Sequence, residues 1–268
     1  MTPMISISVV SHAQADLVEA LLQDLAIIAE ESRMEILLTK NLPEETPDVC
    51  LPSNCLLRVI ENAQAQGFGH NHNAAFALAK GDYFCVLNPD IRLLANPFPV
   101  LLNTLADELN AIAAPQIFGT DGNVQDSVRG FPTLWRLIKR VSGMEYDQTV
   151  PSAAIDPIPV DWAAGMFLVM RSTQYAALGG FDQRYFLYCE DVDLSARVWK
   201  SGRRVMLCPQ ATAIHDARRT SHTNGRYFIW HLTSYIRYFI THFWHSPRAA
   251  RAHVEAKFMS NMADGITG

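Results

Sequence analysis

Charged residues and cysteines are scarce in this sequence. Asp, Glu, Lys and Arg make up 18% of its 268 residues, and the formal net charge is −5 at pH 7. Binding to nucleic-acid phosphates needs a basic surface, so this composition argues against a nucleic-acid partner. The 5 cysteines are odd in number and form no CxxC pair, which predicts neither a zinc site nor a disulfide framework. We expect reduced thiols in a cytoplasmic protein.

Signals for export and for membrane insertion are also lacking. The N-terminal residues carry no basic region ahead of an apolar core and pass directly into a strand-like pattern, so no signal peptide is expected. A transmembrane helix needs about 20 uninterrupted apolar residues. The most aromatic stretch, residues 217–254, is interrupted by His231, Arg237 and His242. Such a stretch is typical of one or two amphipathic helices.

A third glycine is missing from the segment GFGHNHN, residues 67–73. The dinucleotide-binding fingerprint needs three glycines and an acidic residue at the end of the following strand, and neither requirement is met, which disfavours a dehydrogenase. Gly67 and Gly69 are expected to let the backbone pass close to a bound nucleotide. Asn71 or Asn73 is expected to cap the next helix.

Strand and helix patterns alternate through the first third of the chain. Strand-like segments occur at residues 5–10, 35–39, 56–61 and 83–88, and helical segments at 15–31 and from Gly67 as far as Gly81. This order predicts an α/β fold with a Rossmann-like, mostly parallel sheet flanked by helices on both faces. Ligands of such sheets bind at the carboxyl ends of the strands.

Three polar segments follow those strands, and the sheet should bring them to one edge. They are Ser11 with His12, Thr39 to Asn41, and Asn88 to Asp90. Pro89 cannot continue a strand, so Asp90 should point from a turn into the crevice. A carboxylate there can hold Mg²⁺ or Mn²⁺ against a diphosphate, because these ions take one or two protein oxygens and fill the other positions with phosphate and water. An ordinary Asx or proline turn is the alternative.

A second group of acids lies in the segment YFLYCEDVDL, residues 185–194. Helical spacing begins near Asp191, so Glu190 and Asp191 should lie at a helix N-terminus, where the macrodipole favours an ionised carboxylate. Asp193 is expected on the helix surface as a structural charge. A catalytic role for the first two acids and a simple helix-capping role are both compatible with these ten residues.

Four longer motifs together resemble the family 2 glycosyltransferases, which have the GT-A fold. They are VVSHAQ, QGFGHNHNAAFALAKGDYFCVLNPD, WAAGMFLVMRS and GGFDQRYFLYCEDVDLSARVWKSGRRVMLCPQATAIHDARRTS. The chain is most similar to the bacterial rhamnosyltransferases that build surface polysaccharides such as O-antigen, over about residues 5–245. The resemblance implies a GT-A domain at residues 1–222 and an amphipathic helical extension at 223–268, packed on or beside it.

The resemblance also assigns roles to individual residues. Asn88 to Asp90 stand where the family has its DXD metal motif, and His215 stands where several members have a further metal ligand. Asp90 and His215 would then hold Mg²⁺ or Mn²⁺, with Asn88 as a weaker partner. Asp191 stands at the position of the catalytic base, and Glu190 would orient the base or the acceptor.

Contacts to a nucleoside-diphosphate sugar are expected from the glycine-rich segment, the strand ends and two arginines. These residues are Ser11, His12, Thr39, Asn41, Phe68, Gly69, Asn73, Asn88, Arg129 and Arg218. Arginine pairs bidentately with phosphate, although an exposed loop arginine is the alternative for each. His12 and the segment LLTKNLPE depart from the family pattern, which leaves the nucleobase open. The segment from Trp162 to Met166 is expected at the floor of the acceptor site.

The function implied is an inverting, metal-dependent transfer of a sugar to a hydroxyl of a saccharide or a lipid-linked saccharide. L-rhamnose from dTDP-rhamnose is the leading donor, and UDP-galactofuranose and UDP-N-acetylglucosamine are alternatives. A catalytically silent, sugar-nucleotide-binding subunit is the alternative outside enzymes. Arginines and aromatics alternate in residues 217–254 without an acid. This pattern fits either packing on the catalytic domain or peripheral contact with the inner face of the cell membrane.

Overall fold

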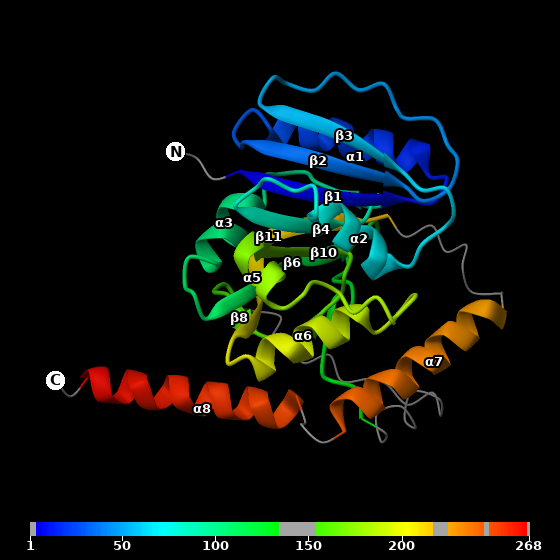
Figure 1. Cartoon of the computed structure of the whole chain (residues 1–268). Coiled ribbons are helices and arrows are strands. Elements are labelled where there is room, and N and C mark those ends of the chain that lie inside the picture. Colours follow the sequence, from blue (N-terminus) through cyan, green and yellow to red (C-terminus); the bar gives the residue numbers. More distant parts are fainter. Residues whose placement is uncertain (1–3, 134–153, 217–224, 244–246, 267–268) are drawn as a thin grey trace.

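A central sheet runs through the molecule, with helices on both of its faces (Figure 1). The structure is a computed structural model that describes residues 4–133, 154–216, 225–243 and 247–266. The strands are β1 (Ile5–Ser11), β2 (Met34–Lys40), β3 (Cys55–Glu61), β4 (Tyr83–Leu87), β5 (Ile91–Arg92), β6 (Asn110–Gly119), β7 (Val128–Arg129), β8 (Ile158–Pro159), β9 (Trp162–Ala163), β10 (Phe167–Arg171) and β11 (Arg204–His215). The helices are α1 (Ala15–Ile28), α2 (Phe68–Phe76), α3 (Phe98–Thr104), α5 (Ser172–Ala177), α6 (Glu190–Lys200), α7 (Gly225–His242) and α8 (Pro247–Ile266).

The predicted mostly parallel sheet is confirmed. Its strand order in the described residues is β3-β2-β1-β4-β10-β6-β11-β5, and β8 pairs with β11. Strands β1, β2, β3 and β4 are parallel to one another, and β6 is parallel to β11. Only β10 runs against both of its neighbours, β4 and β6. The segment ahead of β10 therefore lies at the same edge as the carboxyl ends of β1, β4, β6 and β11.

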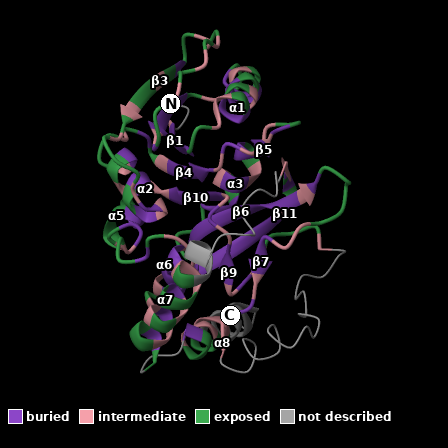
Figure 2. Cartoon of the chain, turned by 90° about the vertical axis from the view of Figure 1, so that its right-hand side faces the viewer, coloured by how far each residue is buried: buried purple, intermediate pink, exposed green. Residues whose placement is uncertain are grey.

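The two faces of the sheet have separate hydrophobic cores. Side chains alternate along a strand, and β4 shows the result: Cys85 and Leu87 pack with α1 and α3, while Phe84 and Val86 pack with α5 and α6. Both sets are buried, as expected of a central strand covered by helices on each side. The central strands are accordingly buried along most of their length (Figure 2).

The glycine-rich segment forms helix α2, which begins earlier in the chain than its asparagines suggested. The helix begins at Phe68 with Gly67 at the N-cap, so Asn71 and Asn73 lie inside it and do not cap it. A residue at the Gly67 position would bring its Cβ within 2.7 Å of the Phe186 carbonyl oxygen. Close packing of the chain around Phe186 therefore explains this glycine.

The C-terminal segment forms two helices, α7 and α8, beyond the sheet (Figure 1). On α7, Tyr238 is buried, and the Ser234 hydroxyl donates to the Leu187 carbonyl oxygen at 2.9 Å, which holds the helix against the segment before α6. The predicted boundary at residues 222 and 223 falls outside the described residues. Among the helices that the structure describes, none combines the length and the apolar character needed to cross a membrane.

Candidate active site

A pocket of about 380 Å³ opens where α6, α7 and the loop before β10 meet the end of β4. Asn88 follows β4, Gly165 precedes β10, and Glu190 and Asp191 begin α6. The pocket is lined by Phe68, Asn88, Asp126, Arg129, Trp162, Ala164, Gly165, Met166, Leu187, Tyr188, Cys189, Glu190, Asp191, Val192, His231 and Tyr235. The backbone N–H of Asn88 donates to the Met166 carbonyl oxygen at 2.9 Å, which joins the two strand ends.

Asp191 is held by backbone hydrogen bonds at the wall of this pocket. Its Oδ2 accepts the N–H of Gly165 at 3.0 Å, and its Oδ1 accepts the N–H of Val192 at 2.8 Å. A side chain at the Gly165 position would contact the Phe68 ring at 3.0 Å and Asp191 Cβ at 3.6 Å, so glycine permits this approach. The segment from Trp162 to Met166 thus adjoins the expected base.

Glu190 and Asp191 have carboxyl groups in different surroundings. Burial, followed by the neighbouring Asp191 charge, holds the pKa of Glu190 well above its usual range, and one of its carboxyl oxygens has no hydrogen-bond partner. Burial also raises the pKa of Asp191, but the N–H groups of Gly165 and Val192 and the charge of Arg129 oppose that rise. When one of two adjacent carboxyls is ionised, these contacts favour Asp191 as the charged one and Glu190 as the protonated one.

Backbone strain positions both acids. Tyr188 and Cys189, directly before α6, have φ angles of 72° and 65°. Such left-handed conformations are uncommon for residues with side chains, and they cluster at functional sites, where surrounding contacts hold them in place. Here the Phe68 N–H donates to the Phe186 carbonyl oxygen at 3.0 Å, and the Tyr188 ring stacks on His231 with 3.7 Å between ring centroids.

Arg129 lies on the pocket wall in β7, not in a loop. Its Nε donates to Asp126 at 2.5 Å, and its guanidinium lies over the Trp162 ring at 5.7 Å. These two contacts orient a cation toward the pocket. The predicted phosphate contact from Arg129 fits this position, whereas Arg218 lies outside the described residues.

Asp90 and His215 come together across two strands, as a metal site requires. His215 ends β11, and the Asp216 N–H donates to the Asp90 carbonyl oxygen at 2.8 Å. Asp90 Oδ2 lies 3.1 Å from His215 Nε2, and Asp90 Oδ1 is buried without a hydrogen-bond partner. Among the described residues no cluster of three or more His, Cys, Asp or Glu side chains forms a ligand set. An ion held by this pair would need other ligands, which a diphosphate can supply.

Gln125 fixes the tautomer of His215, and sequence reasoning missed it. Gln125 Nε2 lies 3.4 Å from the His215 carbonyl oxygen, and its Oε1 lies 2.7 Å from His215 Nδ1. An amide oxygen only accepts hydrogen bonds, so Nδ1 carries a proton, and Nε2 is the nitrogen whose lone pair can face Asp90 when the ring is a metal ligand. Two acceptors that face each other need a proton or a cation between them. The donor set therefore fits a divalent cation, in the arrangement usual for histidine ligands.

Polar residues at the ends of β1 and β2 form a network around Asn41. Asn41 is buried, and its Nδ2 lies 2.8 Å from His12 Nε2 and 2.9 Å from the Gln66 carbonyl oxygen. Burial lowers the pKa of His12, the nearby Glu44 opposing it, so the ring is favoured in its neutral form. Ser11 and Thr39 are buried close by in the same strands. The four predicted residues Ser11, His12, Thr39 and Asn41 thus share one edge of the sheet.

Asn73 and Gly69, both predicted to contact the donor, also make close contacts within the protein. Asn73 Oδ1 accepts the N–H of Phe181 at 3.0 Å and the hydroxyl of Tyr175 at 2.7 Å, and its Nδ2 donates to the Phe181 carbonyl oxygen at 2.8 Å. A Cβ at the Gly69 position would lie 2.7 Å from Phe181 Cβ. Both residues therefore join α2 to the loop at Phe181, and their contacts to the donor stay predictions. Phe68, directly before Gly69, lines the pocket.

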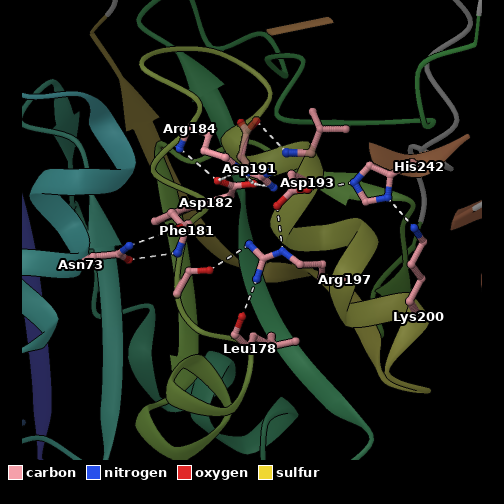
Figure 3. Close-up of polar contacts among 12 residues, drawn as sticks. Asn73, Leu178, Phe181, Asp182, Arg184, Asp191, Asp193, Arg197, Lys200 and His242 are labelled. Atoms are coloured by element: carbon pink, nitrogen blue, oxygen red, sulfur yellow. Dashed lines mark hydrogen bonds and ion pairs between the residues drawn. The ribbon is translucent and has the colours of Figure 1, made fainter. Parts of the chain in front are cut away.

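Asp193 is buried, which corrects the expected surface position. Its side chain is 1% exposed, and it accepts hydrogen bonds from Arg197 at 2.7 Å and from His242 at 2.8 Å (Figure 3). His242 Nδ1 in turn lies 2.6 Å from Lys200 Nζ. Arg197 also donates to the carbonyl oxygens of Leu178 and Gly180, at 2.7 and 2.8 Å. This ionic network joins α6 to α7 and to the loop after α5.

Helix α7 contributes two residues to the pocket that the sequence did not assign to a site. His231 and Tyr235 line the pocket, and their rings lie nearly parallel, with centroids 5.6 Å apart. Together with Tyr188 they form an aromatic wall beside the two acids. The only sequence signal was the run of aromatics and cations in this segment, which also fits a packed helix.

Comparison of the sequence with known proteins identifies its relatives. A family model described as glycosyl transferase family 2 matches residues 6–155. Rhamnosyltransferase WbbL of Escherichia coli (strain K12) is 30% identical over 246 residues, which cover 88% of this chain and 92% of that protein. N-acetylglucosaminyl-diphospho-decaprenol L-rhamnosyltransferase of Mycobacterium tuberculosis (strain CDC 1551 / Oshkosh) is 26% identical over 84% of this chain and 79% of its own length.

Solved structures share the fold at low sequence identity. GalNAc-T7, in a structure with UDP, GalNAc and Mn²⁺, superposes with a TM-score of 0.66 at 15% identity, over 92% of this chain and 49% of that chain. The mannosyltransferase PcManGT from Pyrobaculum calidifontis, in complex with GDP-Man and Mn²⁺, gives a TM-score of 0.58 at 13% identity, over 98% of this chain and 76% of that chain. The expected GT-A fold is confirmed.

Proposed function

Because this chain belongs to glycosyl transferase family 2 and is a glycosyltransferase that uses nucleotide sugars, we propose that it transfers L-rhamnose from dTDP-rhamnose with inversion at the anomeric carbon. The acceptor proposed is a hydroxyl of a saccharide or a lipid-linked saccharide, met in the cytoplasm or at the inner face of the membrane. Two relatives named as rhamnosyltransferases support the donor, and the name of one includes a diphospho-decaprenol acceptor.

One observation carries the proposal: a pocket wall holds two adjacent carboxyls whose surroundings favour opposite protonation states. The ionised Asp191 takes the proton of the acceptor hydroxyl as that oxygen bonds to the anomeric carbon. On the opposite side the bond from that carbon to the phosphate oxygen breaks, and the electron pair leaves with the nucleoside diphosphate. Attack from one side and departure from the other invert the configuration without a covalent sugar intermediate. Protonated Glu190 can donate a hydrogen bond that orients the acceptor.

The leaving diphosphate needs stabilisation of its charge. Asp90 and His215 would hold Mg²⁺ or Mn²⁺, with Asn88 as a weaker or water-mediated partner, and Gln125 keeps the lone pair of His215 Nε2 directed to the site. When bound, the ion neutralises negative charge on the diphosphate. Arg129, on the pocket wall, would add a bidentate contact to a phosphate. At the nucleobase end, the network of His12 and Asn41 supplies polar groups.

A panel of donors tests the proposal. The purified chain is incubated with dTDP-rhamnose, UDP-galactofuranose or UDP-N-acetylglucosamine, with and without a polyprenyl-diphosphate saccharide, and the released nucleoside diphosphate is measured. We expect turnover with dTDP-rhamnose that depends on the acceptor and stops in excess chelator. The anomeric configuration of the product, read by NMR coupling constants, reports inversion or retention.

The same assay separates the alternatives. Turnover restricted to either UDP-sugar would replace the proposed donor and leave the active site as described. A chain that binds nucleotide in calorimetry but releases none from any donor would be a silent binding subunit. Full turnover in excess chelator would contradict the metal assignment of Asp90 and His215.

A further inference from the structure

One face of α7 carries a row of apolar side chains that point away from the protein. Ile229, Leu232, Ile236 and Ile240 are between 49% and 71% exposed. Their spacing of three or four residues puts them on one side of the helix, and Phe243, which is 73% exposed, extends this row by another turn. Exposed residues follow the helix along its outer side in Figure 2. We call these five side chains the outer row.

The opposite face of α7 is firmly attached to the catalytic part of the molecule. His231 and Tyr235 line the pocket, and His242 is buried against Asp193 at the far end of the helix. These contacts fix which side of α7 faces outward. Because an α-helix with its side chains is about 10 Å across, whatever covers the outer row lies roughly that distance from the acceptor side of the pocket.

The charge of residues 225–254 indicates which kind of surface covers the outer row. Residues 225–254 include four arginines and no acidic residue. Arg251 is paired with Asp161 and Glu255, whereas Arg248, in the first turn of α8, is exposed. A second copy packed on the same face would bring two α7 helices together, each with two arginines and no acid, which costs free energy. An anionic lipid surface fits both the apolar outer row and the arginines, because it takes up apolar side chains at headgroup depth and attracts cations.

We propose that the outer row of α7 lies in the headgroup region of an anionic bilayer, so that the pocket opens beside the membrane surface. This inference rests on the proposed function only for the reason why an acceptor would be found there. Helix α7 then has two roles: its inner face forms part of the acceptor wall, and its outer face docks the enzyme. Docking through one helix face and a few cations is reversible and sensitive to salt.

Vesicle flotation tests the proposal with the intact chain. The probes are vesicles of phosphatidylcholine alone and vesicles with phosphatidylglycerol added, at low and high salt. We expect binding to the anionic vesicles that weakens with salt, and a partition coefficient lowered roughly tenfold or more by the double variant Ile236→Glu and Ile240→Glu, because apolar contact is replaced by charge. The matched control is Ile27→Glu with Leu56→Glu, which makes the same changes at 70% and 65% exposed positions on α1 and β3. The control should bind as the unaltered chain does.

Two further measurements keep the outcomes distinct. Thermal unfolding verifies that both double variants are folded, and nucleoside-diphosphate release with a water-soluble acceptor should be the same in all three proteins. Loss of that activity in every protein would contradict the proposed function and leave the docking result intact. Equal vesicle binding by the two double variants, or none by the intact chain, would overturn the proposal. So would a dimer in sedimentation experiments that only the α7 variant abolishes, because the outer row would then be an interface between copies.

Discussion

At the residue scale, the proposed chemistry depends on which of two adjacent carboxyls is charged. The substitution Asp191→Asn keeps a side-chain oxygen that can accept the N–H of Gly165 but removes the group that takes a proton. We expect turnover to fall about 10²- to 10⁴-fold, the usual contribution of a general base, with nucleotide affinity unchanged. Single-turnover kinetics and calorimetry measure the two quantities.

The neighbouring acid provides the control. Because the Glu190 carboxyl is expected to be protonated, Glu190→Gln preserves its charge state and should reduce turnover far less than Asp191→Asn does. If the two effects were reversed, Glu190 would be the base and Asp191 a group that begins the helix.

The pH dependence tests the electrostatic influence of Arg129 on Asp191, the proposed base. Asp191 must be ionised to act, and burial raises its pKa, so the acid limb of the kcat/KM profile should lie above the ordinary range of an aspartate. The charge of Arg129 lowers that pKa. The substitution Arg129→Gln should therefore raise it and shift the acid limb to higher pH, in addition to any loss of donor affinity. If the acid limb of the variant, measured at saturating donor, lay at the same pH as that of the unaltered chain, Arg129 would have no influence on the pKa of Asp191.

Gln125 is predicted to act on the metal site through His215. In the variant Gln125→Leu, His215 loses the partner that holds its tautomer and ring orientation. Loss of such a partner typically lowers metal affinity about 10- to 100-fold. Titration of Mn²⁺ by EPR in the presence of dTDP measures this affinity without turnover. The control Gln210→Leu changes an exposed glutamine in β11, the strand that ends at His215. This control should leave the Mn²⁺ affinity unchanged.

At the scale of elements, helix α6 is held in place by contacts with its neighbours. Its N-terminus carries the two acids, and Asp193, one turn further, joins it to α7 through His242. Arg197 ties the same acid to the loop after α5. The buried Asp193 charge thus connects α6 with α7 and, through Arg197, with the loop after α5.

Two matched arginine substitutions measure that network. Arg197→Gln leaves the buried Asp193 charge poorly compensated and should lower the free energy of unfolding by about 3 kcal/mol. Arg184→Gln removes an arginine whose side chain is 63% exposed and should cost less than about 1 kcal/mol. For a chain of this length, thermal unfolding should show a Tm decrease of roughly 6–12 °C for the first and about 3 °C or less for the second. Equal decreases would mean that Asp193 is more hydrated than its burial indicates.

At the scale of the whole molecule, ligand binding should stabilise the folded chain. With dTDP and Mn²⁺ at about 100 times the dissociation constant, the gain is about 2.7 kcal/mol, equivalent to a rise in Tm of roughly 5–10 °C. Chelator should remove most of that rise, and so should Asp90→Ala, which removes the carboxylate from the metal pair. If dTDP raised the Tm equally in the presence of chelator, nucleotide binding would not depend on a metal. The Tm of Asp90→Ala without ligand reports whether the substitution itself destabilises the fold.

The positions of the strands and of the acids that line the pocket follow from local sequence. Alternating patterns predicted the order of strands and helices over the first third of the chain, and Pro89 correctly marked the end of β4. The helix expected near Asp191 begins at Glu190. Each of these is a local property, because strand and helix periodicity and the end of a strand at proline depend on a few consecutive residues.

Tertiary structure alone decided which polar groups meet and which are buried. Gln125 contacts a histidine 90 residues away, and the buried Asp193 contacts His242 of α7, 49 residues away. Asn73 and Gly69 form part of a motif that resembles a nucleotide-binding segment, yet they pack against Phe181. Local patterns determine whether a segment is helix or strand. Its neighbours, and hence the burial, the protonation and the role of each side chain, are set by long-range packing that no sequence window contains.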